Sequence, residues 1–179
     1  MDPAPDVDAI LDLLEESAAY DDGEPVDLLT HALQCAALLA ETAPIDIELQ
    51  VAGLVHDLGH VDRPGDDAHH ASAGAHIVSD VLGDRVAFLV RHHADAKRYL
   101  VDTDPAYLAA LTPRSRQSLD AQGGPLAGGE LAVLERSHDL DALVALRRAD
   151  DAAKVPNAVV PGLLSWLPTL RAVAGHVEV

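Results

Sequence analysis

The sequence predicts an all-α fold in a single domain. Apolar residues recur at helical spacing along most of the 179 residues, and the alternating β-branched pattern typical of strands is scarce. Gly and Pro divide the apolar stretches into segments of helical length. Because hydrophobic residues make up 49% of the chain and no repeat or linker interrupts it, we expect one domain over residues 1–179.

The first part of the chain is expected to form a series of amphipathic helices. Val7 and Ile10 begin the apolar face of the first one. Gly59 ends the third, so that the adjacent pair His56-Asp57 lies near its C-terminal end. The expected helices cover residues 6–18, 26–40, 45–58, 69–81 and 86–101, and the expected loops cover 21–25, 61–68 and 82–84.

The remainder of the chain continues the helical pattern in shorter segments. Helices are expected to begin near Pro105 and Pro113, because proline fits the first turn of a helix. The Gly-rich stretch 122–129 is expected to be a loop. The last expected helices cover residues 130–136 and 140–154. A Pro-punctuated tail around Trp166 is expected to pack on the bundle, as is the N-terminal helix.

Charge and cysteine content exclude several classes of protein. Thirty acidic against twelve basic residues give a formal net charge of -18, which disfavours nucleic acid or an anionic membrane as a partner. The single Cys35 excludes an intrachain disulfide framework and a cysteine-rich zinc site. The N-terminus does not resemble a signal peptide, and no stretch has the ~20 apolar residues of a membrane span. We therefore expect a cytoplasmic protein, and the sequence defines no oligomeric state.

Histidine is the clearest compositional anomaly, with ten His against twelve Lys and Arg. A lone His is more often a core or surface residue than a ligand. Here imidazoles recur together with carboxylates, a mixed nitrogen and oxygen set that suits iron, manganese or zinc. The residues expected to hold metal are His31, His56, Asp57, His70, His93 and Asp150.

The order of these residues resembles a known superfamily. The stretch His56-Asp-Leu-Gly-His60 is spaced like the two-His helix of zinc proteases, but Asp57 stands where that motif needs a Glu base. The ordered set His31, His56-Asp57 and Asp150 instead resembles the HD-domain superfamily, in which those positions hold a divalent metal. The resemblance implies a single HD-domain helical bundle around a metal site.

Longer strings resemble one branch of that superfamily, the PhnZ-type oxygenases of organophosphonate breakdown, within about residues 20–155. The strings are Thr30-His-Ala-Leu-Gln-Cys-Ala36, Leu54-Val-His-Asp-Leu-Gly-His60, Ala96-Lys-Arg-Tyr-Leu100, Asp104-Pro-Ala-Tyr-Leu108, Ser118-Leu-Asp-Ala-Gln-Gly-Gly-Pro125 and Arg147-Arg-Ala-Asp-Asp-Ala-Ala-Lys154. Members of that branch use two Fe ions, a mixed-valent Fe(II)/Fe(III) pair, with O2 as co-substrate.

The resemblance also implies how the ligands divide between the two irons. His31, His56, Asp57 and Asp150 would hold one, and Asp57, His70 and His93 the other. His69 and His92 compete with their neighbours for two of these places. The family pattern selects the His four residues ahead of Gly74-Ala75 and the His four ahead of Lys97, which are His70 and His93.

The basic residues indicate an anionic substrate. Lys97 and Lys154 are the only lysines, and they lie four residues after His93 and Asp150. Arg147 lies three residues before Asp150. On a helix these spacings place cation and ligand on one face, so the three cations are expected to clamp a phosphonate or phosphate. The alternative is ordinary ion pairs with neighbouring acids.

The resemblance supplies further contacts. His60 would donate to a phosphonate oxygen, and neutral hydrogen bonds would come from Ser115, Ser118 and Gln122. The alternative role of Ser115 is helix capping after Pro113. The residues expected to take part in catalysis are Asp57, His60 and Lys97.

The loop ahead of the first His departs from the family. Its members have a Tyr-x-Gly-Glu signature there, in which the Tyr caps an iron and the Glu lies near the substrate amine. Here Gly23-Glu24 stands at the expected distance, but the Tyr position is Asp21, and Tyr20 lies one residue earlier. Glu24 is expected to contact the substrate. Either Tyr20, through a bulge, or Asp21 would replace the family's Tyr.

The resemblance implies Fe- and O2-dependent cleavage of the C–P bond of a small 1-hydroxyphosphonate, which would release phosphate and a carboxylic acid. The chain has three Tyr, one Phe and one Trp, too few for a rich trimethylammonium cage, which favours a 2-amino-1-hydroxyethylphosphonate-like substrate. The alternative is an HD-type metal-dependent phosphohydrolase of a nucleotide or other phosphate ester, which gives no role to His70 and His93. A regulatory module that only retains metal is disfavoured by the complete ligand set.

Overall fold

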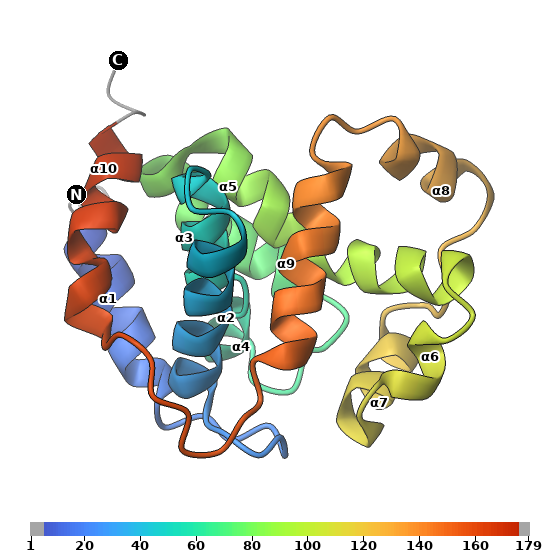
Figure 1. Cartoon of the computed structure of the whole chain (residues 1–179), viewed down its shortest axis with the longest axis horizontal. Helices are drawn as coiled ribbons and strands as arrows, with labels where there is room; N and C mark the ends of the chain where they lie inside the picture. The colour runs from blue at the N-terminus through green and yellow to red at the C-terminus, as the bar shows by residue number, and fades with distance from the viewer. Residues whose placement is uncertain (1–5, 176–179) are drawn as a thin grey trace.

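The computed structural model describes residues 6–175, and over that range every regular element is a helix (Figure 1). The elements are α1 (Val7–Ser17), α2 (Leu28–Thr42), α3 (Ile47–Val55), α4 (Gly59–Asp62), α5 (His70–Thr103), α6 (Tyr107–Ala110), α7 (Pro113–Ala121), α8 (Gly128–Glu135), α9 (Leu140–Ala152), the 3-10 helix η1 (Leu163–Trp166) and α10 (Leu167–Gly175). The all-α prediction is confirmed. None of the described helices is long and apolar enough to cross a membrane.

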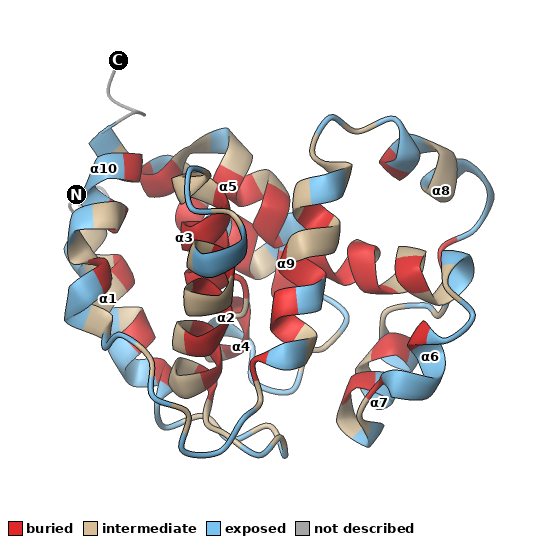
Figure 2. Cartoon of the chain, viewed as in Figure 1, coloured by how far each residue is buried: buried red, intermediate tan, exposed pale blue. Residues whose placement is uncertain are grey.

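The core lies between α2, α3, α5 and α9, which pack against one another (Figure 1). The surfaces that these helices share are buried, whereas exposed residues lie mainly on the loops and the outer helices (Figure 2). Leu39, Leu54, Leu89 and Leu146, one from each of the four helices, are at most 1% exposed. Burial of one such side chain contributes about 1.5 to 3 kcal/mol, so the shared core fixes these helices relative to one another.

Peripheral helices cover both ends of this core. At one edge α1 contacts α10, and Ile10 and Leu170 join the main core (Figure 1). At the other end α6 and α7 contact α5, where Leu100, Tyr107 and Leu119 belong to a smaller buried cluster. Residues 1–5 and 176–179, which complete the predicted domain, lie outside the described range.

Side-chain caps fix the starts of several helices. Asp6, Asp27 and Asp46 each accept a hydrogen bond from a backbone N–H in the first turn of α1, α2 and α3. Thr112 caps α7 in the same way, directly ahead of Pro113. Such a cap stabilises a helix by about 1 kcal/mol, and a carboxylate also interacts favourably with the helix dipole.

Gly83 divides α5 into two helical segments. Its φ of 84° and ψ of 172° are not helical, although hydrogen bonding continues across it. A positive φ of this size is readily adopted only by glycine. The predicted helices 69–81 and 86–101 are therefore present as two segments joined at a sharp kink.

The turn after α3 differs from the prediction. The helix ends at Val55, and His56 is its C-cap, so the His56-Asp57 pair lies on a turn instead of inside a helix ending at residue 58. The short α4 follows and extends into the predicted loop 61–68. A Cβ atom at Gly59 would lie 1.9 Å from the carbonyl oxygen of His70, so glycine permits α4 to approach α5 this closely.

The C-terminal tail also differs, because it contains α10. Leu170 and Val173 are buried, which explains why this segment becomes a helix on the bundle. Pro168 favoured an irregular tail, but it falls in the first turn of α10, where proline is tolerated. Leu170, Val173 and Trp166 belong to the main core cluster, so this segment lies against the bundle.

Candidate metal centre

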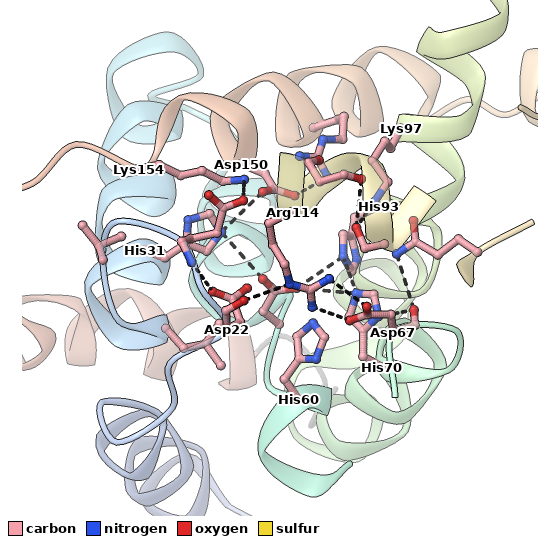
Figure 3. Close-up of a pocket in the computed structure, with 18 residues that line it drawn as sticks. Asp22, His31, His60, Asp67, His70, His93, Lys97, Arg114, Asp150 and Lys154 are labelled. Carbon is pink, nitrogen blue, oxygen red and sulfur yellow. Dashed lines mark hydrogen bonds and ion pairs between the residues drawn. The ribbon is translucent and has the colours of Figure 1, made fainter. Parts of the chain in front are cut away.

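Six ligand-type side chains from distant parts of the chain converge inside the bundle. They form two groups of three, and within each group one ligand atom per residue lies within 4.8 Å of the others. The first group is His31, His56 and Asp150, and the second is Asp57, His70 and His93. These are the six residues predicted from the sequence as metal ligands, and four of them are labelled in Figure 3.

The first group joins α2, the turn after α3, and α9. The Nε2 atoms of His31 and His56 lie 3.2 Å apart. His31 Nε2 is 3.4 Å from Asp150 Oδ1, and His56 Nε2 is 3.7 Å from Asp150 Oδ2. Ligands bound to one metal at about 2.0 to 2.2 Å lie roughly 3 to 3.5 Å from one another, so these separations are close to those around a single cation.

The second group combines Asp57 with one histidine from each of the two helical segments of α5. The Nε2 atoms of His70 and His93 lie 3.1 Å apart, and Asp57 Oδ1 is 3.6 Å and 3.4 Å from them. The other oxygen of Asp57, Oδ2, is 3.3 Å from His56 Nε2 and 3.6 Å from His31 Nε2. Asp57 therefore directs one oxygen toward each group.

All four histidines are oriented in the same way by the backbone. The Nδ1 of His56, His70 and His93 lies 2.7 to 2.9 Å from the carbonyl oxygen three residues earlier. The Nδ1 of His31 lies 2.9 Å from the carbonyl of Ala153, at the end of α9. A carbonyl only accepts, so each Nδ1 donates its proton, and Nε2 faces the centre as the potential metal ligand.

The charges at the centre attract a cation. Burial raises a carboxyl pKa, but neighbouring positive groups outweigh it and hold the pKa of Asp57 and Asp150 well below ordinary values. Burial lowers the pKa of His56, whereas the two carboxylates raise it, to about 9. Burial and the nearby His93 lower the pKa of His70 to about 3. Ionised carboxylates thus face imidazoles in a buried space, an arrangement that favours a bound metal.

The three predicted cations reach the centre, but with different partners. Arg147 donates to Asp150 at 2.6 Å and also pairs with Asp151. Lys154 pairs with Glu24 at 2.8 Å, across 130 residues of sequence. Within residues 6–175 Lys97 forms no ion pair with a carboxylate, and its Nζ donates to a serine hydroxyl, Ser118 Oγ, at 2.7 Å.

Lys97 is therefore the cation available to an anionic ligand. Its side chain is 2% exposed and lines the same pocket as the metal ligands. Burial and the nearby Arg147 lower the pKa of Lys97 to about 7. An anion bound beside the ammonium group would favour its charged form.

Arg114 and Asp67 also line the pocket, and the sequence analysis missed both. Arg114 donates to both oxygens of Asp67, at 2.6 and 2.8 Å, and to the carbonyl of Asp22 at 2.9 Å. In Figure 3 this guanidinium lies across the front of the drawn pocket. It joins α7 to the loops that precede α2 and α5, and no local spacing in the sequence connects these segments.

Comparisons with known proteins match this geometry. The family model for the HD domain matches residues 28–125. The chain belongs to the HD-domain family. A [1-hydroxy-2-(trimethylamino)ethyl]phosphonate dioxygenase (glycine-betaine-forming) of Leisingera caerulea is 33% identical over 157 residues, 83% of this chain and 80% of the relative. A hydroxymethylphosphonate dioxygenase of Gimesia maris is 32% identical over an alignment of 183 residues, 97% of this chain and 90% of the relative.

These relatives define the branch of the HD-domain family to which the chain belongs. An uncharacterised protein of Acanthamoeba polyphaga mimivirus is also similar, 28% identical over 160 residues, 83% of this chain and 73% of the relative. The predicted family and the predicted enzyme class, an HD-domain oxygenase, are confirmed by the two phosphonate dioxygenases.

His60 belongs to α4 and lines the same pocket. Its ring stacks on His70, with centroids 4.2 Å apart and planes 8° apart, and it is 5% exposed. The buried Nδ1 of His60 has no hydrogen-bond partner in the described part of the chain. A buried polar atom without a partner is costly, so this nitrogen is suited to a ligand atom in the pocket.

The neutral residues predicted from α7 and its C-cap also line the pocket. The Thr112 hydroxyl caps α7 by accepting a hydrogen bond from the Ser115 backbone N–H. Ser115 therefore takes part in helix capping through its backbone. Ser118 Oγ donates to the Ser115 carbonyl while it accepts from lysine. The buried Gln122 Oε1 has no partner among the described residues. These groups surround the space beside Lys97.

The loop ahead of α2 places neither alternative for the family's Tyr among the residues that line the pocket. Tyr20 stacks beside His60, with centroids 5.7 Å apart, and its hydroxyl accepts from the backbone N–H of Gly65. Asp21 is exposed, and its carboxylate accepts from Gly23 N–H within the same loop. Asp22, the next residue, lines the pocket instead.

Proposed function

We propose that this HD-domain oxygenase binds two iron ions and uses O2 to cleave the C–P bond of a small 1-hydroxyphosphonate, with phosphate and a carboxylic acid as products. Each product holds one oxygen atom more than the fragment from which it forms, so one O2 balances the reaction. The observation that carries the proposal is the position of Asp57, with one oxygen facing each group of ligands. A bridging carboxylate is typical of two-metal sites.

The residues present fit two irons. Four imidazole Nε2 atoms converge with their Nδ1 protons directed at carbonyls, and carboxylates complete each group. Nitrogen and oxygen donors without thiolate suit iron in the ferrous and ferric states. In this assignment His31, His56, Asp57 and Asp150 would hold one iron, and Asp57, His70 and His93 would hold the other. When bound, the iron pair would supply the one-electron chemistry with O2.

The chain itself would bind and orient the phosphonate. The Lys97 ammonium group would neutralise one negative charge of the phosphonate. Ser118 Oγ, which accepts a hydrogen bond from Lys97, would lie beside the phosphonate oxygen that Lys97 binds. His60 has a free ring nitrogen for a hydrogen bond to the phosphonate. Ser115 and Gln122 border the same space. Fixing the phosphonate in this way also fixes C1 beside the metal ligands, which lowers the entropic part of the barrier.

The remaining predicted contacts act less directly. Arg147 holds Asp150 through an ion pair at 2.6 Å, and we assign it the orientation of that ligand. Lys154 and Glu24 neutralise each other at the edge of the pocket. Tyr20 supports His60 by stacking. In these three interactions the side chains bind one another or a metal ligand, so we assign them to shaping the pocket.

The decisive experiment compares phosphate release from hydroxymethylphosphonate and from 2-amino-1-hydroxyethylphosphonate with and without O2. We expect release from at least one of them in air, at one O2 consumed per phosphate, and none under strict anaerobiosis. The control is p-nitrophenyl phosphate, a phosphate ester that should not be hydrolysed. Undiminished phosphate release without O2 would contradict the proposal and support a metal-dependent phosphohydrolase.

A further inference from the structure

Acids and bases in the pocket largely neutralise each other. The ion pairs are Arg114 with Asp67, Lys154 with Glu24, and Arg147 with Asp150 and Asp151. Among the residues of 6–175 that line the pocket, apart from the metal ligands, two charged side chains take part in no ion pair. They are the Lys97 ammonium group and the Asp22 carboxylate.

These two unpaired charges lie on opposite sides of the pocket. In Figure 3 Lys97 comes from α5 on one side of the labelled metal ligands, and Asp22 comes from the loop before α2 on the other. Asp22 is held in place from two directions. Its Oδ1 accepts from the Glu24 backbone N–H at 3.1 Å, and its carbonyl accepts from Arg114 at 2.9 Å.

We propose that Asp22 binds an ammonium group at the end of the substrate opposite the phosphonate. The inference rests on the proposed function, in which Lys97 binds the phosphonate. One unpaired ammonium group and one unpaired carboxylate on opposite sides of the pocket then match a zwitterion with a phosphonate at one end and an ammonium group at the other. Asp22, instead of Glu24, determines specificity for the substrate tail, because Glu24 Oε1 already accepts from Lys154 and Thr112, each at 2.8 Å.

The lining of the pocket selects a primary ammonium group. A quaternary ammonium has no N–H donor and is bound mainly by the faces of aromatic rings. None of the described residues that line the pocket is Phe, Tyr or Trp. A primary ammonium has three N–H donors, and a carboxylate such as that of Asp22 accepts them in charge-assisted hydrogen bonds.

The test compares Asp22→Asn with the wild type on 2-amino-1-hydroxyethylphosphonate and hydroxymethylphosphonate, and it measures the wild type also on the trimethylammonium analogue of the aminated substrate. The amide keeps an acceptor for the Glu24 N–H but loses the negative charge. We expect kcat/KM for the aminated substrate to fall about tenfold or more, and kcat/KM for hydroxymethylphosphonate to change less than about twofold. The matched control is Asp21→Asn, an exposed acid in the same loop, which should leave both values unchanged.

Other outcomes separate the inference from the proposed function. If kcat/KM of Asp22→Asn falls equally on both substrates, Asp22 has a structural role. If kcat/KM falls on neither substrate, Asp22 does not bind the ammonium group. Both results overturn the inference. A wild type that prefers hydroxymethylphosphonate or the trimethylammonium analogue overturns it as well, while the proposed oxygenase activity stands. A wild type that turns over none of the three phosphonates in air contradicts the proposed function itself.

Discussion

The Oδ1 of Asp57 lies 3.4 Å from the Nε2 of His93, while the other oxygen of the same carboxylate faces His56 at 3.3 Å. Asp57 belongs to the turn after α3, and His93 belongs to the second segment of α5. One carboxylate therefore connects ligands from both sides of the core. The number of metal ions is the property that depends most directly on this contact.

His93→Ala is expected to reduce the iron content from two per chain to one. The variant removes a ligand of the second group and leaves the first group of His31, His56 and Asp150 complete. Iron would be measured by elemental analysis of protein made in iron-rich medium. His92→Ala is the matched control, because the Nδ1 of His92 bonds to Asp95 and the side chain is 30% exposed. Two irons retained in His93→Ala would contradict the assignment.

Lys97→Ala is expected to weaken phosphonate binding without loss of iron. A charge-assisted hydrogen bond is worth about 1.5 to 3 kcal/mol, so KM should rise about 10- to 100-fold. The measurement pairs steady-state kinetics with iron analysis. Arg91→Ala, an exposed cation on the same helix, is the control and should change neither quantity. A parallel loss of iron and activity in Lys97→Ala would instead indicate a structural role.

Local sequence patterns predicted most of the fold. Helical spacing predicted the helices of the core, and Gly83 marked the kink in α5. The same reasoning missed α10, because the segment around Trp166 was predicted only as a Pro-punctuated tail, whereas the burial of Leu170 and Val173 stabilises a helix there. Tertiary packing overrides a local signal in such cases.

The sequence predicted which residues belong to the site better than it predicted which of them pair with one another. The six metal ligands were predicted from their order along the chain and from the family strings around them, and the structure brings all six together. The ion-pair partners of the cations could not be predicted in this way. Helical spacing placed Lys154 near Asp150, but it did not indicate the ion pair of Lys154 with Glu24, 130 residues away. Arg114 was missed for the same reason, because its partner Asp67 lies 47 residues earlier. Ion pairs between loops depend on the assembled fold.

Arg85→Met is expected to destabilise the fold at neutral pH and to matter less in acid. Arg85 donates to both oxygens of Asp46 at 2.7 Å, and also to Glu48 and Asp139, which ties the kink in α5 to the starts of α3 and α9. The guanidinium holds the pKa of Asp46 below its ordinary value of 3.8. We expect the free energy of unfolding to fall by about 1 to 2 kcal/mol at pH 7.

The pH dependence of this effect follows from the direction of the pKa shift. A carboxyl with a lowered pKa in the folded state stabilises the fold above its unfolded pKa, and this contribution is lost as the pH falls through the folded pKa. Denaturant unfolding at pH 7 and near pH 3 should therefore show a smaller difference between Arg85→Met and wild type in acid. Arg148→Met, which removes an exposed pair with Asp104, should cost less than about 0.5 kcal/mol. An Arg85 effect independent of pH would contradict this account.

Gly59→Ala is expected to damage both stability and the second group of ligands. A Cβ atom at this position would lie 1.9 Å from the His70 carbonyl oxygen and 2.8 Å from the Gly74 nitrogen, so α4 and α5 must separate. We expect a loss of about 3 kcal/mol in the free energy of unfolding, together with a lower iron content, because His70 moves with its backbone. Gly129→Ala is the control, since a Cβ there meets no atom within 4 Å and alanine favours the helix by about 0.5 to 1 kcal/mol. Wild-type iron content in Gly59→Ala would show that the contact between α4 and α5 does not position His70.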